Sequence, residues 1–284
     1  MTGIFERATA VTRRDSTGAT ARFDAMVHDG WDIGGNANGG YLLAIAGRAM
    51  AEVTGRPPLT ITAHYLAPAP AGPCTIDVAL VRSGRRMATA TAALCQGDRE
   101  VIRVLGTFAE QTTDPVDAPI LVDGGPPELP DYERCEVPPP PASPAHGPMP
   151  QLNERLAVRM RPGDSGFRAG TPTGRAEMAG WFAFADERPI DAIALLLAAD
   201  AFAPPIFNTE LPVAWVPTLE LTVHVRGVPV PGPLSCVFRS RFVMGDLVEE
   251  DGEMWDVAGN LVCQSRQLSL TPRPLTPRPL TPRG

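Results

Sequence analysis

LTITAHYLAPAPAGP, residues 59–73, is matched 160 positions later by LELTVHVRGVPVPGP, residues 219–233. Both stretches alternate apolar and polar residues, both carry a histidine at the sixth position, and both end in Gly-Pro. Five of the fifteen positions are identical. Such alternation is typical of a half-buried β-strand. The match therefore predicts that the chain is built from two similar halves.

The neighbours of the two stretches correspond as well. Each follows an apolar, helix-like segment, GYLLAIAGRAMAEV at 40–53 and IDAIALLLAADAF at 190–202. Each precedes strand-like sequence, at 74–83, 86–96 and 100–108 in the first half and at 234–243, 247–257 and 260–270 in the second. A helix that is apolar nearly all round must be buried on most sides, and an antiparallel sheet curling around it supplies the cover. We therefore expect an α+β fold, a double hot dog, in which two antiparallel sheets each wrap around one long helix.

Proline marks the expected boundaries. The chain has 32 prolines, and they are dense between Pro126 and Pro150, where the backbone favours extended conformations. The last residues repeat the unit LTPRP and contain too little apolar sequence to fold alone. We expect four segments, in order an N-terminal hot-dog domain at 1–112, a proline-rich linker at 113–150, a C-terminal hot-dog domain at 151–270 and a disordered tail at 271–284.

Composition argues against several protein classes. A net charge of -7 and a pI of about 5.2 disfavour a nucleic-acid binder, which normally presents a basic face. The sequence holds no run of about 18 apolar residues, so no membrane span is expected. The five cysteines are odd in number and never form C-x-x-C, which favours free thiols in a reducing cytoplasm over disulfides or a metal site.

Four segments of the sequence resemble one known family, the TesB-like, type II acyl-CoA thioesterases. These are WDIGGNANGGYLLAIAGRAM (31–50), RPIDAIALLLAADAF (188–202), WVPTLELTVHVR (215–226) and GNLVCQSRQLSL (259–270). The resemblance covers roughly residues 5–270 and implies a double hot dog that hydrolyses acyl-CoA without a cofactor. It also implies a catalytic set of Asp200, Thr218 and Gln267.

Examined as residues, the three members of this set differ in how clearly they point to function. Asp200 interrupts an apolar run, where a charge is costly unless it is paired. It either serves the chemistry or bonds a neighbouring backbone near the helix end. Thr218 alternates with Glu220 and Thr222 on the face opposite the apolar one, so it would need a β-bulge to reach the helix. Gln267 falls in step with small residues that could leave room beside a pocket, or it is a surface polar residue.

GGNANGG, residues 34–40, stands directly before the first helix-like segment. It is not a phosphate loop, because the Gly-Lys-Ser/Thr element is missing, and it has no G-x-G-x-x-G pattern. The N–H groups at a helix start are free, so Asn38, Gly39 and Gly40 are expected to bind substrate. Close packing of helix against sheet is the alternative, and both can hold.

Hydrolysis of a thioester needs a positioned water, a proton acceptor and donors for the developing oxyanion. The set predicts direct attack of water held by Asp200, Thr218 and Gln267. Two other functions remain open. One is a non-catalytic acyl-CoA or lipid binder, and the other is an acyl-CoA hydratase or dehydratase, which would need an Asp and a His a few residues apart. Since hot-dog sheets often pair across subunits, we expect a homodimer or larger homo-oligomer.

Overall fold

The structure is a computed structural model in which residues 3–110, 121–140 and 150–272 are described. The expected tail at 271–284 therefore lies almost wholly outside the described residues, as do parts of the expected linker at 113–150.

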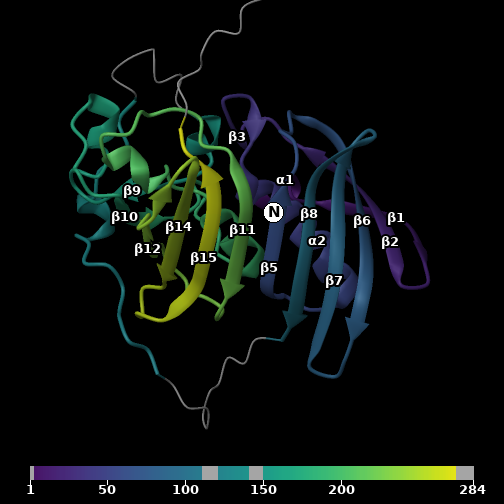
Figure 1. The fold of residues 1–284 in the computed structure, drawn as a ribbon. Helices are drawn as coiled ribbons and strands as arrows, with labels where there is room; N and C mark the ends of the chain where they lie inside the picture. Colours follow the sequence, from purple (N-terminus) through teal and green to yellow (C-terminus); the bar gives the residue numbers. More distant parts are fainter. Residues whose placement is uncertain (1–2, 111–120, 141–149, 273–284) are drawn as a thin grey trace, which may run out of the picture.

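The N-terminal half consists of strands that surround one long helix, α2, which lies behind them in Figure 1. Its elements are α1 (Ile4–Ala8), β1 (Val11–Thr17), β2 (Thr20–Val27), β3 (Asp32–Ile33), β4 (Asn36–Ala37), α2 (Gly39–Thr54), β5 (Pro58–Tyr65), β6 (Gly72–Ser83), β7 (Met87–Gln96) and β8 (Arg99–Ala109). Helix α2 begins where Asn38 caps it, with Asn38 Oδ1 accepting a hydrogen bond from the N–H of Tyr41 at 2.9 Å. It ends at Gly55, whose φ of 68° closes the helix in the left-handed conformation.

The C-terminal half repeats this plan with a much shorter helix. Its strands and its α-helix are β9 (Arg159–Met160), β10 (Glu177–Phe182), α3 (Ala192–Ala198), β11 (Thr218–Val225), β12 (Leu234–Arg239), β13 (Val243–Met244), β14 (Leu247–Trp255) and β15 (Leu261–Leu270). Short 3-10 helices complete it at η1 (Tyr132–Arg134), η3 (Gln151–Glu154), η4 (Gly166–Ala169) and η5 (Pro205–Asn208).

The expected long helix over 190–202 is wrong in length, because α3 has only seven residues. The N–H of Asp200 donates to the carbonyl of Leu197, an i to i+3 bond that tightens the last turn. The backbone then meets Pro204 and Pro205, and a residue before proline is disfavoured in the α conformation. Asp200 consequently lies just past the helix end instead of on its side.

Thirteen strands of the described chain form one antiparallel sheet, in the order β1-β2-β6-β7-β8-β5-β11-β15-β14-β12-β10-β9, with β13 beside β14. The expectation of two separate sheets is therefore corrected, since β5 of one half pairs with β11 of the other. Strands β5 and β11 would each be an edge strand in a separate half, and each covers the free edge of the other. The α+β double hot-dog prediction itself is confirmed.

The junction between β5 and β11 carries the internal repeat. Thr62 pairs with Thr222, and their hydroxyl oxygens are 2.8 Å apart. His64 pairs with Glu220 and His224 with Thr60, so residues 160 apart are related by a local two-fold axis through the threonine pair. Both histidines are exposed on the outer face. The sequence match thus marks the point where the two halves join.

The inner face of the sheet packs on the two helices. Ile61 and Ala63 of β5 and Leu221 and Val223 of β11 are fully buried there. The helices run antiparallel and very close together, because a Cβ on Gly40 would lie 2.7 Å from the carbonyl oxygen of Leu196 at the other helix's end. The start of α2 therefore meets the end of α3 inside the sheet.

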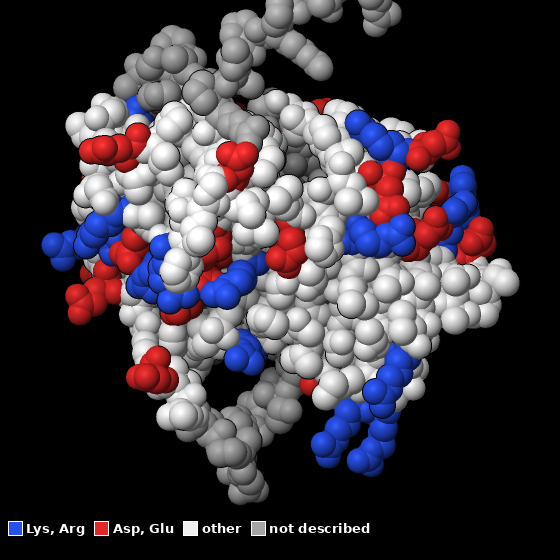
Figure 2. Space-filling model, in the orientation of Figure 1, with Lys and Arg blue, Asp and Glu red and all other residues white. Residues whose placement is uncertain are grey.

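The outer face that Figure 2 shows carries acidic and basic side chains side by side. In this view they are interspersed instead of forming one continuous basic surface.

Candidate active site

Asp200 lies directly against the start of α2. Its Oδ2 accepts a hydrogen bond from Asn38 Nδ2 at 2.9 Å and another from the N–H of Gly40 at 2.9 Å. Asn38 Nδ2 also donates to the backbone oxygen of Asp200 at 2.7 Å. The positive end of the α2 dipole favours a carboxylate at this position. Two stretches that are far apart in sequence, Asn38–Gly40 and Asp200, thus form one site.

The surroundings of Asp200 set its proton affinity. Burial raises the pKa of this carboxyl to about 6, and hydrogen bonds from Gly40, Gly39 and Asn38 oppose that rise. The side chain is partly buried. A carboxyl with a pKa near 6 is largely ionised at pH 7 yet still basic enough to take a proton from water. The position suits a general base.

Asn38 and Gly40 donate hydrogen bonds to Asp200 in this structure. Asn38 is only 3% exposed, and both ends of its side chain are bonded, to Asp200 and to the N–H of Tyr41. The N–H of Gly40 is also engaged by the carboxylate. Their role as direct substrate contacts, predicted together with Gly39, stays a prediction.

Gly39 and Gly40 lie so close to their neighbours that a side chain at either position would crowd them. A Cβ on Gly39 would lie 3.0 Å from Asp200 Oδ2 and 3.0 Å from two ring carbons of Tyr65. A Cβ on Gly40 would lie 2.9 Å from the Cβ of Asp200. The alternative reading of close packing at this helix start is therefore what the geometry supports directly.

Thr218 reaches the inner face of the sheet through a β-bulge. It pairs with Ser269, whereas Glu220 pairs with Leu268, so the register shifts by one residue between them. Partners in an antiparallel pair point to the same face, and Ser269 is buried on the same side as Gln267. The bulge removes the parity conflict that the sequence alone showed for Thr218.

Gln267 is on the inner face of β15 and is 6% exposed. Its Nε2 donates to Ser269 Oγ at 3.0 Å. Its Oε1 is buried and has no hydrogen-bond partner in the described chain. A buried acceptor without a donor is costly, and such groups commonly bind water or a ligand.

Glu250 is a site residue that the sequence reading missed. It pairs with Gln267 across β14 and β15, on the face that also holds the buried Val248 and Met254. Burial raises the pKa of its carboxyl well above the usual range, and the charge of Asp200 raises it further. Its alternation with Val248 and Met254 was the signal in the sequence that could have identified it.

Tyr65 is a second residue that the sequence reading missed. It ends β5 in step with the buried Ile61 and Ala63, and its ring packs on Gly39. Its hydroxyl is buried and has no partner within the described residues. Burial raises the pKa of this phenol well above its ordinary value, with a further rise from the charge of Asp200.

The sheet and the helix ends therefore bring a set of polar groups toward one place. Asp200 comes from the end of α3, and Thr218, Gln267 and Glu250 line the inner face of three neighbouring strands. Within the described ranges, no direct hydrogen bond joins Asp200 to Thr218 or Gln267. A water or a substrate would have to connect them.

Comparison with known proteins places this site in a family. The chain matches the acyl-CoA thioesterase N-terminal domain over residues 27–109 and the acyl-CoA thioesterase C-terminal domain over residues 132–271. It belongs to the acyl-CoA thioesterase family. The resemblance inferred from the sequence is confirmed, and so is the prediction of a thioesterase-like hydrolase at the level of the family.

Related chains cover nearly the whole length of this thioesterase-family protein. An uncharacterised protein of Mycobacterium tuberculosis is 28% identical over 292 aligned residues, 96% of this chain and 99% of that one. A candidate thioesterase II of Thermobifida fusca is 26% identical with a TM-score of 0.82, covering 95% of this chain and 98% of that one. A hot-dog protein of unknown function from Alicyclobacillus acidocaldarius is 21% identical with a TM-score of 0.79, covering 97% and 100%.

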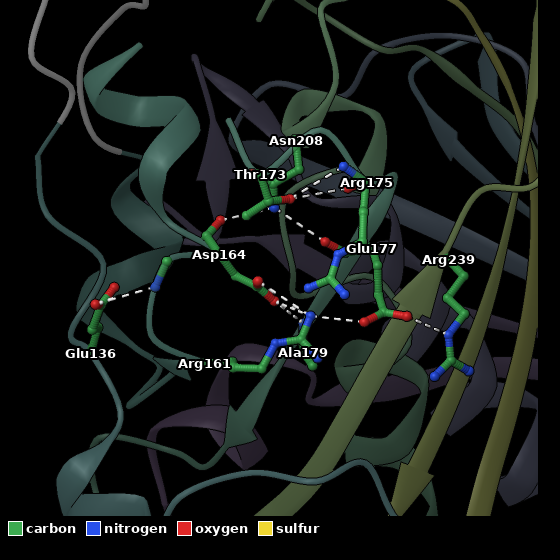
Figure 3. Close-up of polar contacts among 10 residues, drawn as sticks. Glu136, Arg161, Asp164, Thr173, Arg175, Glu177, Ala179, Asn208 and Arg239 are labelled. Atoms are coloured by element: carbon green, nitrogen blue, oxygen red, sulfur yellow. Dashed lines mark hydrogen bonds and ion pairs between the residues drawn. The ribbon is translucent and has the colours of Figure 1, made fainter. Parts of the chain in front are cut away.

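A second polar cluster of this thioesterase-family chain is structural. Arg161 contacts Asp164 at 3.0 Å and Glu177 at 2.8 Å, and Asn208 Nδ2 donates to the backbone oxygen of Asp164 at 3.1 Å (Figure 3). These bonds tie the 3-10 segments to β10. Ser165, in the stretch GDSGF, is buried beside them, and its hydroxyl has no hydrogen-bond partner among the described residues. The cluster therefore fixes the loops of the C-terminal half.

Other features of the described chain bear on cofactors and access. The described residues contain no group of three or more His, Cys, Asp or Glu that could hold a metal ion, and their cysteines are free. No helix among them is long and apolar enough to cross a membrane. A cavity of about 130 Å³ lies beside the start of α2, and its lining includes His28, Asp32 and Ala37.

Proposed function

We propose that this protein hydrolyses acyl-CoA thioesters to a free carboxylic acid and coenzyme A by direct attack of water. The observation that carries the proposal is the Asp200 carboxylate, held at the start of α2 by Asn38 and Gly40 with a pKa of about 6. The carboxylate comes from one half of the chain and the helix start from the other.

In the proposed reaction, Asp200 accepts a proton from a water whose oxygen attacks the thioester carbonyl carbon. The carbon–sulfur bond then breaks, and the electron pair leaves with sulfur as the coenzyme A thiolate. The attacking oxygen remains in the carboxylic acid product. No covalent enzyme intermediate and no cofactor are needed, because the thiolate departs readily once the tetrahedral centre has formed.

Gln267 and Thr218 are proposed to hold the attacking water. Gln267 has a buried Oε1 that finds no partner within the described ranges, and this oxygen can accept a hydrogen bond from that water. Thr218 is brought to the same face by the bulge in β11 and offers a hydroxyl. Glu250 lies opposite Gln267, and burial together with the charge of Asp200 raises the pKa of its carboxyl, which favours the neutral form beside Asp200.

We also propose a substrate, an assembly and a location for this enzyme. We place acyl-CoA as the substrate, with Asn38, Gly39 and Gly40 at the site's edge. A homodimer or larger assembly is supported by the outermost strand β1, which pairs with β2 on one side. A cytoplasmic location is supported by the free cysteines of the described chain.

The test is release of free thiol from a panel of acyl-CoAs of short to long chain, comparing wild type with Asp200→Asn. Asp191→Asn is the matched control, since Asp191 caps α3 and Asn caps a helix equally well. We expect wild-type release that falls at least tenfold in Asp200→Asn and persists in Asp191→Asn. Release that survives Asp200→Asn would reject this site. Absence of release with every chain length, together with tight acyl-CoA binding, would favour a non-catalytic binder.

A further inference from the structure

The three tyrosines of the chain differ in the state of their hydroxyl groups. Tyr41 Oη donates to the carbonyl of Ala8 at 2.8 Å, and Tyr132 Oη donates to the carbonyl of Ala157 at 2.8 Å. Tyr65 Oη is shielded from solvent but has no partner in the part of the chain that is described. A buried hydroxyl normally finds a partner, so its absence here calls for a group that arrives with a ligand.

The position of Tyr65 identifies where that ligand group would be. A Cβ on Gly39 would lie 3.0 Å from Tyr65 Cζ and 3.0 Å from Asp200 Oδ2, so the phenol carbon and the carboxylate oxygen are within twice that distance of each other. Because Gly39 has no side chain, the phenol ring and the carboxylate can both approach the start of α2 this closely. The Tyr65 hydroxyl therefore borders the place where Asp200 would activate water.

The other donors at this helix start are already engaged. The N–H of Gly40 and the side-chain amide of Asn38 both donate to Asp200 Oδ2. The N–H of Gly39 also stabilises the ionised form of that carboxyl and so lowers its pKa. They hold the base, so the carbonyl oxygen of a substrate needs a donor from elsewhere. Because burial keeps the phenol of Tyr65 protonated, its pKa being raised well above the ordinary value, it can only serve as that donor at neutral pH.

We propose that Tyr65 is a further catalytic residue, whose hydroxyl donates a hydrogen bond to the thioester carbonyl oxygen while Asp200 takes the proton from water. This inference rests on the proposed hydrolysis. The tyrosine keeps its proton throughout. As the carbonyl oxygen becomes negative, the bond strengthens, so the contribution appears in the transition state more than in substrate binding.

The test compares three Tyr→Phe variants that differ in whether the lost hydroxyl has a partner. Tyr65→Phe should lower kcat on the order of 10²-fold, the usual effect of removing one oxyanion donor, with KM nearly unchanged. Its Tm should equal or exceed that of wild type, because no hydrogen bond is lost. Tyr41→Phe and Tyr132→Phe should do the reverse, lowering Tm and leaving kcat close to wild type.

A binding measurement separates a carbonyl contact from a packing role. An S-alkyl coenzyme A thioether, which has no carbonyl oxygen, should bind wild type and Tyr65→Phe with equal Kd. A Tyr65→Phe enzyme with wild-type kcat, alongside an inactive Asp200→Asn, would overturn the inference and leave the proposed function intact. A wild type inactive on every acyl-CoA would overturn the proposed function, and this inference with it.

Discussion

Replacing Gly40 with Ala adds one methyl group at the closest approach of the two helices. The new Cβ would lie 2.7 Å from the carbonyl oxygen of Leu196, 2.9 Å from the Cβ of Asp200 and 3.0 Å from the carbonyl oxygen of Leu197. Two of these three neighbours are backbone atoms, which cannot rotate out of the way. The start of α2 must therefore move away from Asp200.

The expected change in the free energy of unfolding is the balance of two opposing effects. Overpacking of a buried site costs roughly 1–3 kcal/mol, while Gly→Ala within a helix contributes roughly 0.5–1 kcal/mol in favour of the fold. We expect a net loss of about 1–2 kcal/mol, which corresponds to a Tm lower by roughly 2–8 °C for a protein of this size. Since the N–H of Gly40 holds Asp200 Oδ2 at 2.9 Å, kcat/KM should fall at least tenfold.

Gly47→Ala is the matched control on the same helix. Its Cβ would lie 2.7 Å from Leu196 Cδ1, the end of a side chain that can shift, and 3.7 Å from Ile193 Cδ1. The assay is thermal unfolding together with thiol release for both variants. Gly47→Ala should change stability by less than about 1 kcal/mol and keep its rate. A Gly40→Ala enzyme with wild-type rate, or equal losses in both variants, would refute the reasoning.

Four further predictions concern the proposed catalytic groups. Because burial raises the pKa of Asp200 to about 6, kcat/KM should rise about tenfold per pH unit below pH 6 and level off above about pH 7. The folded state binds this proton more tightly than the unfolded chain, so Asp200→Asn should gain stability relative to wild type as pH rises from about 4 to 7 in urea titrations. Glu250→Gln should keep a rate close to that of wild type, because burial and the charge of Asp200 raise the pKa of Glu250 and favour its neutral form, which Gln resembles; a large loss of thiol release would contradict this. Thr218→Val should lower kcat at least tenfold with little change in Tm, whereas Thr222→Val, whose hydroxyl bonds another threonine on the outer face, should lose some stability and keep its rate.

The fold could be predicted largely because its signals are local and repeated. The alternation at 59–73 and 219–233 identified the two strands that join the halves, and the apolar run at 40–53 identified α2 to within a residue at each end. The length of α3 was not predictable from its apolar composition. Its end is set by an i to i+3 bond at Leu197 and by Pro204–Pro205 further on. The pairing of β5 with β11 is a contact between halves, and no local pattern encodes it.

The candidate site was predicted in its residue types more than in its geometry. Asp200 was visible because a charge interrupts an apolar run, and the glycines at 39 and 40 because they precede a helix. Thr218 was assigned to the wrong face by simple alternation, since one extra residue in a bulge reverses the parity of a strand end. Tyr65 and Glu250 were missed because only their contacts with residues of other elements show that they lie near Asp200 and Gln267, and no local sequence pattern encodes those contacts.

The two helix starts show why one half alone does not contain the site. At the start of α3, Asp191 caps the N–H of Ala194 at 2.7 Å, and Arg188 bridges Asp191 at 3.0 Å and Glu6 at 2.6 Å. The free N–H groups at the start of α3 are thus capped by a residue of the same half, and Arg188 holds the capping carboxylate in an ion pair. Helix α2 has no acidic residue in its first turn, so its positive end is met by Asp200 from the other half. The proposed base and the helix that stabilises its charge come together only when both halves are folded on each other, and the proposed chemistry of this chain therefore depends on its duplication.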